Sequence, residues 1–260
     1  MMGYVIGLDM GSTTTKALLL ADKEMIYEIR PTGVNPHETG KMLLSLLCSR
    51  AGISLDDVAC IVATGYGRVN APYASIKISE IACHAKGAYF INRNVRIVID
   101  VGGQDSKVIA VGSEGEVVDF YMNDKCAAGT GRFLDIMAST LEMSHEEMAH
   151  AALSSRNPAK ISSMCTVFAE SEVISLIAKG ARKEDIAAGL CHAIADRLAS
   201  MVRKLGVKGV IMMSGGVAKN TGLVNILGKK LGEKIYVPDE PQIIGALGAA
   251  LIAKEKNRRY

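Results

Sequence analysis

Residues 9–16 read Asp-Met-Gly-Ser-Thr-Thr-Thr-Lys, and residues 100–107 read Asp-Val-Gly-Gly-Gln-Asp-Ser-Lys. Each stretch stands between two apolar runs, which predicts a strand, a glycine-rich turn and a returning strand. A third strand is expected after each pair, over residues 25–30 and 117–122. The same unit of three strands therefore occurs twice, and we interpret it as an internal duplication of the topology.

The turn of the first unit has the composition of a phosphate-binding loop. Gly11 lets the backbone come close to an anion, and Ser12 and Thr13 can hydrogen-bond phosphate oxygens. Asp9 can hold Mg²⁺, often through water. A polar hairpin without a ligand would have the same composition, so this turn alone does not indicate a function.

The second turn repeats the same device. Two such hairpins facing each other would clamp phosphate groups around Mg²⁺, although neither is a Walker A loop, which needs Gly-x-x-x-x-Gly-Lys-Ser/Thr. We predict that Asp100 orients metal-bound water or activates the attacking water, and that Gln104 and Asp105 reach the γ-phosphate region. Together with Asp9, these are the predicted catalytic residues.

A third glycine-rich loop, Ser-Gly-Gly-Val-Ala-Lys-Asn at residues 214–220, follows a strand expected over residues 207–214. A Gly-Gly pair there lets an adenine or a ribose lie against bare backbone. The alternative is that the same residues form only a tight turn between a strand and a helix. The order and strand contexts of the three loops together indicate a nucleotide site. The predicted nucleotide-binding residues are Gly11, Ser12, Thr13, Thr14, Lys16, Gly102, Gly103, Gly215, Gly216, Val217, Ala218 and Asn220.

The remaining chain predicts the further helices and strands of an α/β fold. Strands are expected over residues 4–10, 17–20, 58–64, 96–101, 108–111 and 234–237. Helices are expected over residues 37–51, 78–90, 129–142, 145–153, 167–179, 183–205, 221–231 and 243–253, followed by a basic, solvated tail over residues 254–260.

The composition disfavours several classes of function. The 260-residue chain has a net charge of +3, no Trp and 4 Phe, which argues against nucleic acid as a ligand. No apolar run reaches the ~18 residues of a membrane helix, and the N-terminus lacks the basic segment of a signal peptide. We therefore expect a cytoplasmic protein that binds neither nucleic acid nor a membrane.

Four of the six cysteines stand in surroundings typical of a buried thiol. Cys48 and Cys60 lie in apolar runs, and Cys83 and Cys191 each precede a histidine within a predicted helix. Adjacent helical residues point about 100° apart, so these Cys-His pairs rarely bind one metal together. We predict that all four thiols are buried.

Cys126 and Cys165 stand instead in polar loops just before predicted helices. A helix N-terminus carries partial positive charge and unpaired N–H groups, so it favours a thiolate over a thiol. Two thiolates are too few for an iron–sulfur cluster, which usually takes four, but a twofold dimer would supply four. The alternative is that both are helix-cap residues without a ligand.

In their order and strand contexts, the three glycine-rich loops resemble the phosphate-1, phosphate-2 and adenosine segments of the actin, Hsp70 and sugar-kinase ATPase superfamily. The resemblance covers nearly the whole chain and implies an α/β fold of two RNase H-like domains with the nucleotide between them. It implies a first domain over residues 1–93 and 242–260 and a second over residues 94–241.

Three further segments resemble a narrower family, the activator components of 2-hydroxyacyl-CoA dehydratases and the ATPase subunits of benzoyl-CoA reductase. They are residues 63–68, Ala-Thr-Gly-Tyr-Gly-Arg, residues 122–135 around Cys126, and residues 162–173 around Cys165. This resemblance implies a homodimer of anaerobic cells that binds ATP or ADP with Mg²⁺. It also implies one [4Fe–4S] cluster per dimer, held by Cys126 and Cys165 of each protomer.

The activity implied by this resemblance is ATP-driven electron transfer. Hydrolysis would send one low-potential electron from ferredoxin or flavodoxin to an iron–sulfur dehydratase or reductase. Two alternatives on the same fold are a small-molecule kinase acting on an acid or a sugar, and an actin-like assembly module. Neither alternative explains the two cysteine segments.

Overall fold

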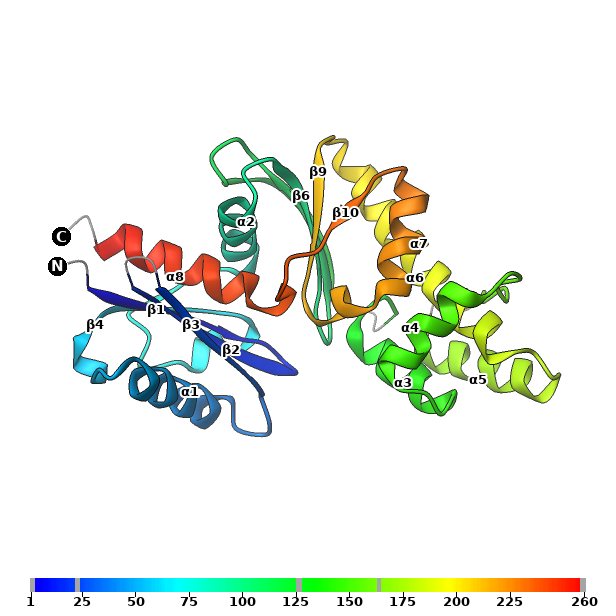
Figure 1. The fold of residues 1–260 in the computed structure, drawn as a ribbon, viewed down its shortest axis with the longest axis horizontal. Helices are drawn as coiled ribbons and strands as arrows, with labels where there is room; N and C mark the ends of the chain where they lie inside the picture. Colours follow the sequence, from blue (N-terminus) through cyan, green and yellow to red (C-terminus); the bar gives the residue numbers. More distant parts are fainter. Residues whose placement is uncertain (1–2, 22–23, 125–127, 163–164, 258–260) are drawn as a thin grey trace. The chain divides into compact units, whose positions relative to one another are not determined.

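The structure is a computed structural model that describes residues 3–21, 24–124, 128–162 and 165–257 (Figure 1). The chain forms two compact units. The first draws on Met1–Val95, Ala110–Val118 and Asp239–Tyr260, and the second on Arg96–Ile109 and Asp119–Pro238. The domain boundaries implied by the resemblance remain a prediction.

The first sheet belongs to the first unit and has five strands in the order β3-β2-β1-β4-β5. β1 pairs antiparallel with β2 and parallel with β4, so the carboxyl ends of β1 and β4 meet at the same edge. The strands are β1 (Tyr4–Met10), β2 (Thr14–Ala21), β3 (Glu24–Pro31), β4 (Val58–Thr64) and β5 (Ile76–Lys77).

Side chains of the first sheet alternate between two apolar layers. Val5 and Leu18 belong to a cluster with α2 (Glu80–Ile91) and α8 (Ile244–Asn257), whereas the neighbouring residues Ile6 and Leu19 belong to a cluster with α1 (Pro36–Ala51). Figure 1 shows α8 and α1 on opposite faces of these strands. Burial on both faces explains why the strands read as nearly continuous apolar runs and fixes the position of β1.

The helix α8 is longer than the sequence predicts. It continues to Asn257, so the predicted helix end at residue 253 is wrong, whereas residues 255–257 are exposed to solvent as predicted. Lys254 and Lys256 lie in its last turn, where cations complement the helix dipole. Glu255 pairs with Lys86 of α2 at 2.6 Å, which further fixes the end of the helix.

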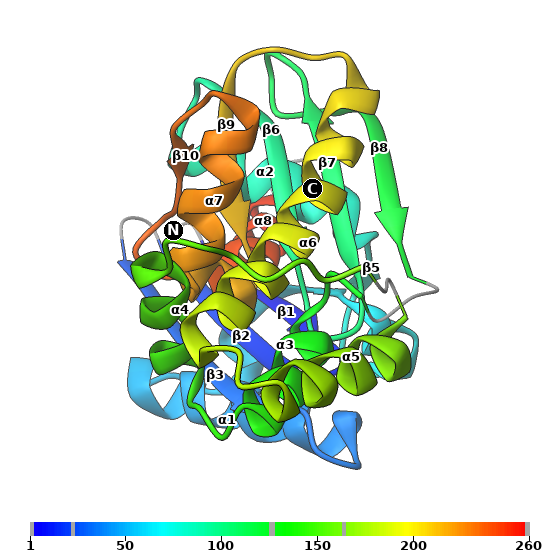
Figure 2. The same cartoon turned by 90° about the vertical axis from the view of Figure 1, so that its right-hand side faces the viewer.

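The second sheet has the order β10-β9-β6-β7-β8. Its strands are β6 (Val95–Val101), β7 (Ser106–Val111), β8 (Val117–Asn123), β9 (Val210–Ser214) and β10 (Ile235–Tyr236). The accompanying helices are α3 (Gly131–Thr140), α4 (His145–Ser154), α5 (Thr166–Ala178), α6 (Lys183–Leu205) and α7 (Thr221–Leu231). Figures 1 and 2 show α6 and α7 side by side on one face of this sheet.

The strand predicted from residue 207 begins only at Val210. Gly206 takes a left-handed conformation with φ 64° and ends α6, so residues 207–209 form a connection.

The two sheets repeat one strand order. The orders β3-β2-β1-β4-β5 and β8-β7-β6-β9-β10 match position by position, which confirms the predicted internal duplication. Between its third and fourth strands the first repeat has one α-helix, α1, whereas the second repeat has α3 to α6. Both predicted cluster cysteines fall, by sequence position, in this longer insertion. Of the helices in the described residues, none combines the length and hydropathy that a membrane crossing requires.

Candidate functional site

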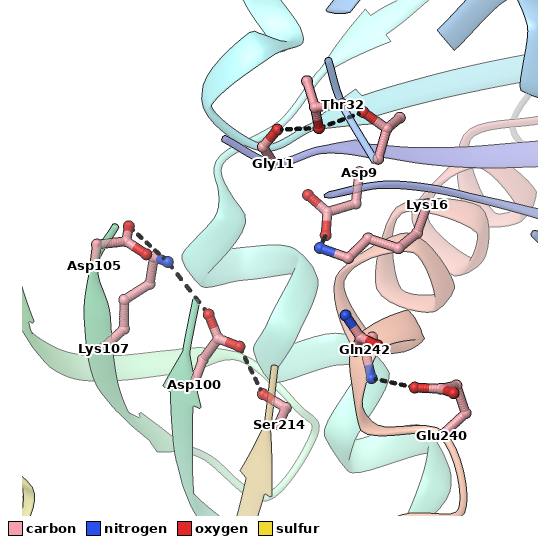
Figure 3. A network of polar contacts seen from close by, with 11 residues as sticks. Asp9, Gly11, Lys16, Thr32, Asp100, Asp105, Lys107, Ser214, Glu240 and Gln242 are labelled. Carbon is pink, nitrogen blue, oxygen red and sulfur yellow. Dashed lines mark hydrogen bonds and ion pairs between the residues drawn. The ribbon is translucent and has the colours of Figure 1, made fainter. Parts of the chain in front are cut away.

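Each repeat places a buried aspartate near the end of its first strand, paired with a lysine of its second strand (Figure 3). Asp9 Oδ2 lies 3.2 Å from Lys16 Nζ, and Asp100 Oδ2 lies 3.2 Å from Lys107 Nζ. The two aspartates are 5% and 3% exposed. A carboxylate with so little access to water needs a cation or hydrogen-bond donors, and the lysine supplies both.

Hydroxyl groups fix the turn of the first hairpin. Thr32 Oγ1 donates to the carbonyl oxygen of Gly11 at 2.7 Å and lies 2.9 Å from Thr15 Oγ1. Because the single hydroxyl proton of Thr32 goes to Gly11, Thr15 is the donor in the second bond. The Thr32 amide donates to the carbonyl of Thr13 at 2.9 Å. The predicted phosphate-contacting residues 11–14 are therefore held in a defined turn, half-buried or exposed.

The second hairpin carries more charge than the first. Lys107 Nζ lies 2.8 Å from Asp105 Oδ2 as well as near Asp100. Ser214 Oγ donates to Asp100 Oδ1 at 3.0 Å from β9, the neighbouring strand. The Gly102 amide donates to the carbonyl of Asp105 at 3.0 Å and closes the turn. Each carboxylate oxygen of Asp100 therefore has a donor, Lys107 Nζ for Oδ2 and Ser214 Oγ for Oδ1.

A glycine with positive φ follows the fourth strand of each repeat. Gly65 has φ 87° and ψ 172°, and Gly215 has φ 84° and ψ 173°, a region that essentially only glycine adopts. A Cβ on Gly65 would lie 2.7 Å from Asp9 Oδ1, and one on Gly215 would lie 2.9 Å from Asp100 Oδ1. Gly215 is a predicted nucleotide-binding residue, whereas Gly65 is not. Two features of the sequence point to Gly65, its place in the duplication and the segment of residues 63–68 that contains it.

Buried polar atoms without a protein partner gather at these strand ends. Among the described residues, the hydroxyl oxygen of Ser106 and the amide nitrogen of Asn220 are buried and lack a hydrogen-bond partner. Asn220 uses its Oδ1 to cap α7, where it accepts from the Leu223 amide at 2.9 Å. Such atoms are costly unless a ligand or water satisfies them. Hydroxyl and amide donors fit the acceptors of a nucleotide.

The carboxylates of Asp9, Asp100 and Asp105 are oxygen donors of the kind that Mg²⁺ prefers. Within the described part of the chain, no three His, Cys, Asp or Glu side chains are grouped closely enough to hold a metal ion. A bound Mg²⁺ would therefore take phosphate oxygens or water among its ligands, which fits the predicted water-mediated role of these aspartates.

The first turn of α3 contacts the second hairpin directly. The amide of Gly131 donates to the carbonyl of Gly102, and the amide of Arg132 donates to the carbonyl of Gly103, both at 2.8 Å. A Cβ on Gly131 would lie 3.1 Å from Gly102 O and 3.5 Å from a methyl group of Val217. One glycine thus brings α3 against both the second hairpin and the loop that follows β9.

Cys165 differs from the other described cysteines. It is the N-cap residue of α5 and is exposed, whereas Cys48, Cys60, Cys83 and Cys191 are buried, which confirms the sequence prediction for those four. Burial raises the pKa of Cys191 to about 12, so this thiol is a poor metal ligand. Cys126, the other predicted ligand, lies outside the described residues.

Ser162 is bound to a side chain of α5. It donates to the carboxylate of Glu172 through its amide at 3.1 Å and through its hydroxyl at 3.0 Å. Glu172 therefore has a hydrogen-bond partner outside its own helix. The hydroxyl of Thr166, in the first turn of α5, is buried and lacks a partner among the described residues. An exposed thiol at the N-terminus of a helix, next to a hydroxyl donor, fits a thiolate bound to iron.

The structure groups the predicted residues at the strand ends of each unit. Gln104 is exposed at the tip of its hairpin, Gly216 is exposed, and Val217 and Ala218 are buried in a short 3₁₀ turn after Gly215. Residues at these strand ends that are not among the predicted site residues are Thr15, Thr32, Thr64, Gly65, Lys107 and Ser214.

The chain matches known proteins over almost its whole length. The sequence model of the BadF/BadG/BcrA/BcrD ATPase family matches residues 6–253. The chain is 45% identical over 251 residues to the 2-hydroxyisocaproyl-CoA dehydratase activator of Clostridioides difficile, covering 96% of this chain and 94% of that protein. It is 44% identical over 255 residues to the (R)-2-hydroxyglutaryl-CoA dehydratase activating ATPase of Acidaminococcus fermentans, covering 97% and 98%.

A solved structure shares the fold of the whole chain. The activator of the 2-hydroxyisocaproyl-CoA dehydratase from Clostridium difficile, with bound ADPNP, superposes with a TM-score of 0.91 at 44% identity. The match covers 98% of this chain and 96% of that one. The predicted α/β fold of the actin and Hsp70 class is thereby confirmed.

Proposed function

This chain belongs to the BadF/BadG/BcrA/BcrD ATPase family, and on that premise we propose that it is an iron–sulfur activator. It hydrolyses ATP and passes a low-potential electron from ferredoxin or flavodoxin to a 2-hydroxyacyl-CoA dehydratase or a related reductase. Relatives named as activators of such dehydratases support this assignment. We take the working form to be a homodimer, and a cytoplasmic location remains a prediction.

The nucleotide is bound, in this proposal, by the three loops that follow Asp9, Asp100 and Ser214. The unsatisfied donors of Ser106 and Asn220 support it, because both are buried near the strand ends of the second unit. Asp9 and Asp100 keep their carboxylates fixed by a lysine, so they can orient the water around Mg²⁺ without having to reorganise during hydrolysis.

The contact between α3 and the second hairpin is the main support for coupling between the nucleotide and the cysteine segments. α3 follows the Cys126 segment, and α3 in turn packs against α5, whose N-cap is Cys165. A change at Gly102 and Gly103 on hydrolysis therefore has a direct backbone route to both cysteine segments. Such a connection is what coupling between a nucleotide and a redox centre requires.

When bound, the cluster supplies one-electron chemistry. Cys165 would hold it with a thiolate stabilised by the N-terminus of α5, together with Cys126 and the same pair from a second copy. A change of ~1.4 kcal/mol in the surroundings shifts a one-electron potential by ~59 mV. Movement of charged helix ends relative to the cluster can therefore change its potential substantially.

Iron content tests the proposal. Protein purified without oxygen should hold about four iron and four sulfide per dimer, as one bridging cubane requires. Cys165→Ser should lower iron below about one per dimer, because a serine hydroxyl does not replace a thiolate. Cys48→Ala, at a buried cysteine in the first unit, is the matched control and should keep its iron.

The two halves of the proposal can fail separately. A wild-type protein that stays free of iron after anaerobic reconstitution would refute the electron-transfer role. If such a protein also phosphorylated a small acid or sugar, the chain would be a kinase of the same fold. Loss of iron in Cys165→Ser with ATP hydrolysis retained is the result we expect.

Gly131→Val should uncouple the nucleotide from the cluster. A branched side chain at this position pushes against Gly102 O and Val217, so the contact between α3 and the hairpin must open. The measurement is the rate at which a chelator removes iron, with and without ATP. We expect the ATP-dependent ratio of rates to fall about fivefold or more, in the range of ordinary coupling free energies.

Ser139→Val is the control for this change. Ser139 is exposed near the other end of α3, so the variant places the same branched side chain in this helix without touching the hairpin. An unchanged ATP-dependent ratio in Gly131→Val would show that the coupling runs elsewhere.

A further inference from the structure

The two glycine-rich hairpins correspond residue by residue, but their lysines have different surroundings. Asp9 and Lys16 occupy the same places in the first hairpin as Asp100 and Lys107 in the second, seven residues apart in each. Lys16 Nζ contacts one carboxylate, that of Asp9, and its side chain is 13% exposed. Lys107 Nζ contacts two carboxylates, and its side chain is 3% exposed.

The difference originates at one position of the turn. The first hairpin has Thr14 where the second has Asp105. The Asp105 carboxylate lies 2.8 Å from Lys107 Nζ and is 26% exposed, so it faces both the lysine and the surface. Asp105 is also fixed through its backbone, since its carbonyl accepts from the Gly102 amide. The second hairpin thus holds two carboxylates on one ammonium, whereas the first holds one.

A buried ammonium between two carboxylates sets their relative geometry. Its N–H donors belong to one nitrogen atom, so the carboxylates of Asp100 and Asp105 must stay close to each other while both remain bound to it. Ser214 Oγ holds the other oxygen of Asp100. Lysine is seldom fully buried unless it is paired, and here the pairing joins the end of β6 to the turn that follows it.

We propose that Lys107 is a positioning residue of the ATPase, which acts through Asp100 and Asp105 and does not itself contact the nucleotide. Lys16, with one carboxylate partner and a more exposed ammonium, is the lysine of the duplicated pair that contacts the phosphate groups. The duplication has therefore diverged into a binding lysine and a positioning lysine. This inference rests on the ATPase activity of the proposed function.

The test separates kcat from KM for ATP in two matched variants. Lys107→Met should lower kcat about 30- to 100-fold with KM within about threefold of wild type, because displaced aspartates impair the chemical step rather than binding. Lys16→Met should raise KM about tenfold or more, since a phosphate contact is lost. Lys230→Met, which removes an exposed ion pair with Asp196, should change neither parameter.

A double variant shows whether charge pairing is the cause. Lys107→Met leaves two carboxylates facing each other without their cation, and Asp105→Asn removes one of those charges. We expect the double variant to lose less kcat than the product of the two single losses, because the replaced groups act together. The double variant also replaces Lys107→Met if the single variant fails to fold.

The outcomes are distinct. Wild-type kcat in Lys107→Met, or in the double variant when the single does not fold, would overturn the inference. So would a rise in KM for Lys107→Met equal to that of Lys16→Met, because both lysines would then be binding residues. A wild-type protein without any ATPase activity would instead refute the proposed function itself.

Discussion

Replacing Gly215 with alanine is expected to lower the free energy of unfolding by at least about 3 kcal/mol and to weaken ATP binding. The backbone at this position, φ 84° and ψ 173°, is strained for any residue with a Cβ. That Cβ would also lie 2.3 Å from the carbonyl oxygen of Val101 and 2.9 Å from Asp100 Oδ1. Neither contact is tolerable, so the end of β6 must move, and Asp100 moves with it.

Gly232→Ala is the matched control. Gly232 also has a positive φ, 71°, but a Cβ there meets nothing within 4 Å. It should cost only about 1 kcal/mol, the strain of the left-handed backbone alone. Urea unfolding measures the free energy of unfolding of both variants, and a nucleotide-binding titration measures their affinity for ATP. Equal midpoints for the two variants would show that the close approach at Gly215 is unimportant.

The hairpins, the duplication and the buried cysteines can be predicted from the sequence because they depend on local patterns. The apolar runs on either side of Asp9 and Asp100 indicate the hairpins, and the same pattern occurring twice indicates the duplication that the strand orders confirm. The buried thiols were identified because Cys48 and Cys60 stand among aliphatic residues. In each case the determining interactions lie within a few residues along the chain.

Features that depend on distant residues could not be predicted in this way. Ser214 meets Asp100 across 114 positions, and Gly131 meets Gly102 because two elements converge on one turn. Lys107 belongs to the motif at residues 100–107, but a lysine is expected at the surface, and its burial depends on a second carboxylate, that of Asp105. The two-residue strand β5 carries too short a pattern to recognise.

Asp100→Asn is expected to lower the kcat of ATP hydrolysis about 1000-fold and to leave the iron content unchanged. The amide keeps the size of the side chain but removes the charge that orients water near the γ-phosphate. Lys107 retains Asp105 as a partner, so the variant should fold. Iron content should persist because Cys165 lies on α5, outside the hairpin that Asp100 belongs to.

Ser214→Ala is the comparison variant for Asp100→Asn. It removes the hydroxyl that donates to Asp100 Oδ1 but keeps the carboxylate, so a loss of only about tenfold in kcat is expected. Cys165→Ser completes a reciprocal test. Asp100→Asn and Ser214→Ala should lose ATP hydrolysis and keep their iron, whereas Cys165→Ser should lose its iron and keep ATP hydrolysis. If Asp100→Asn lost iron as readily as Cys165→Ser, the hairpin would be needed to build the cysteine segments rather than to act on ATP.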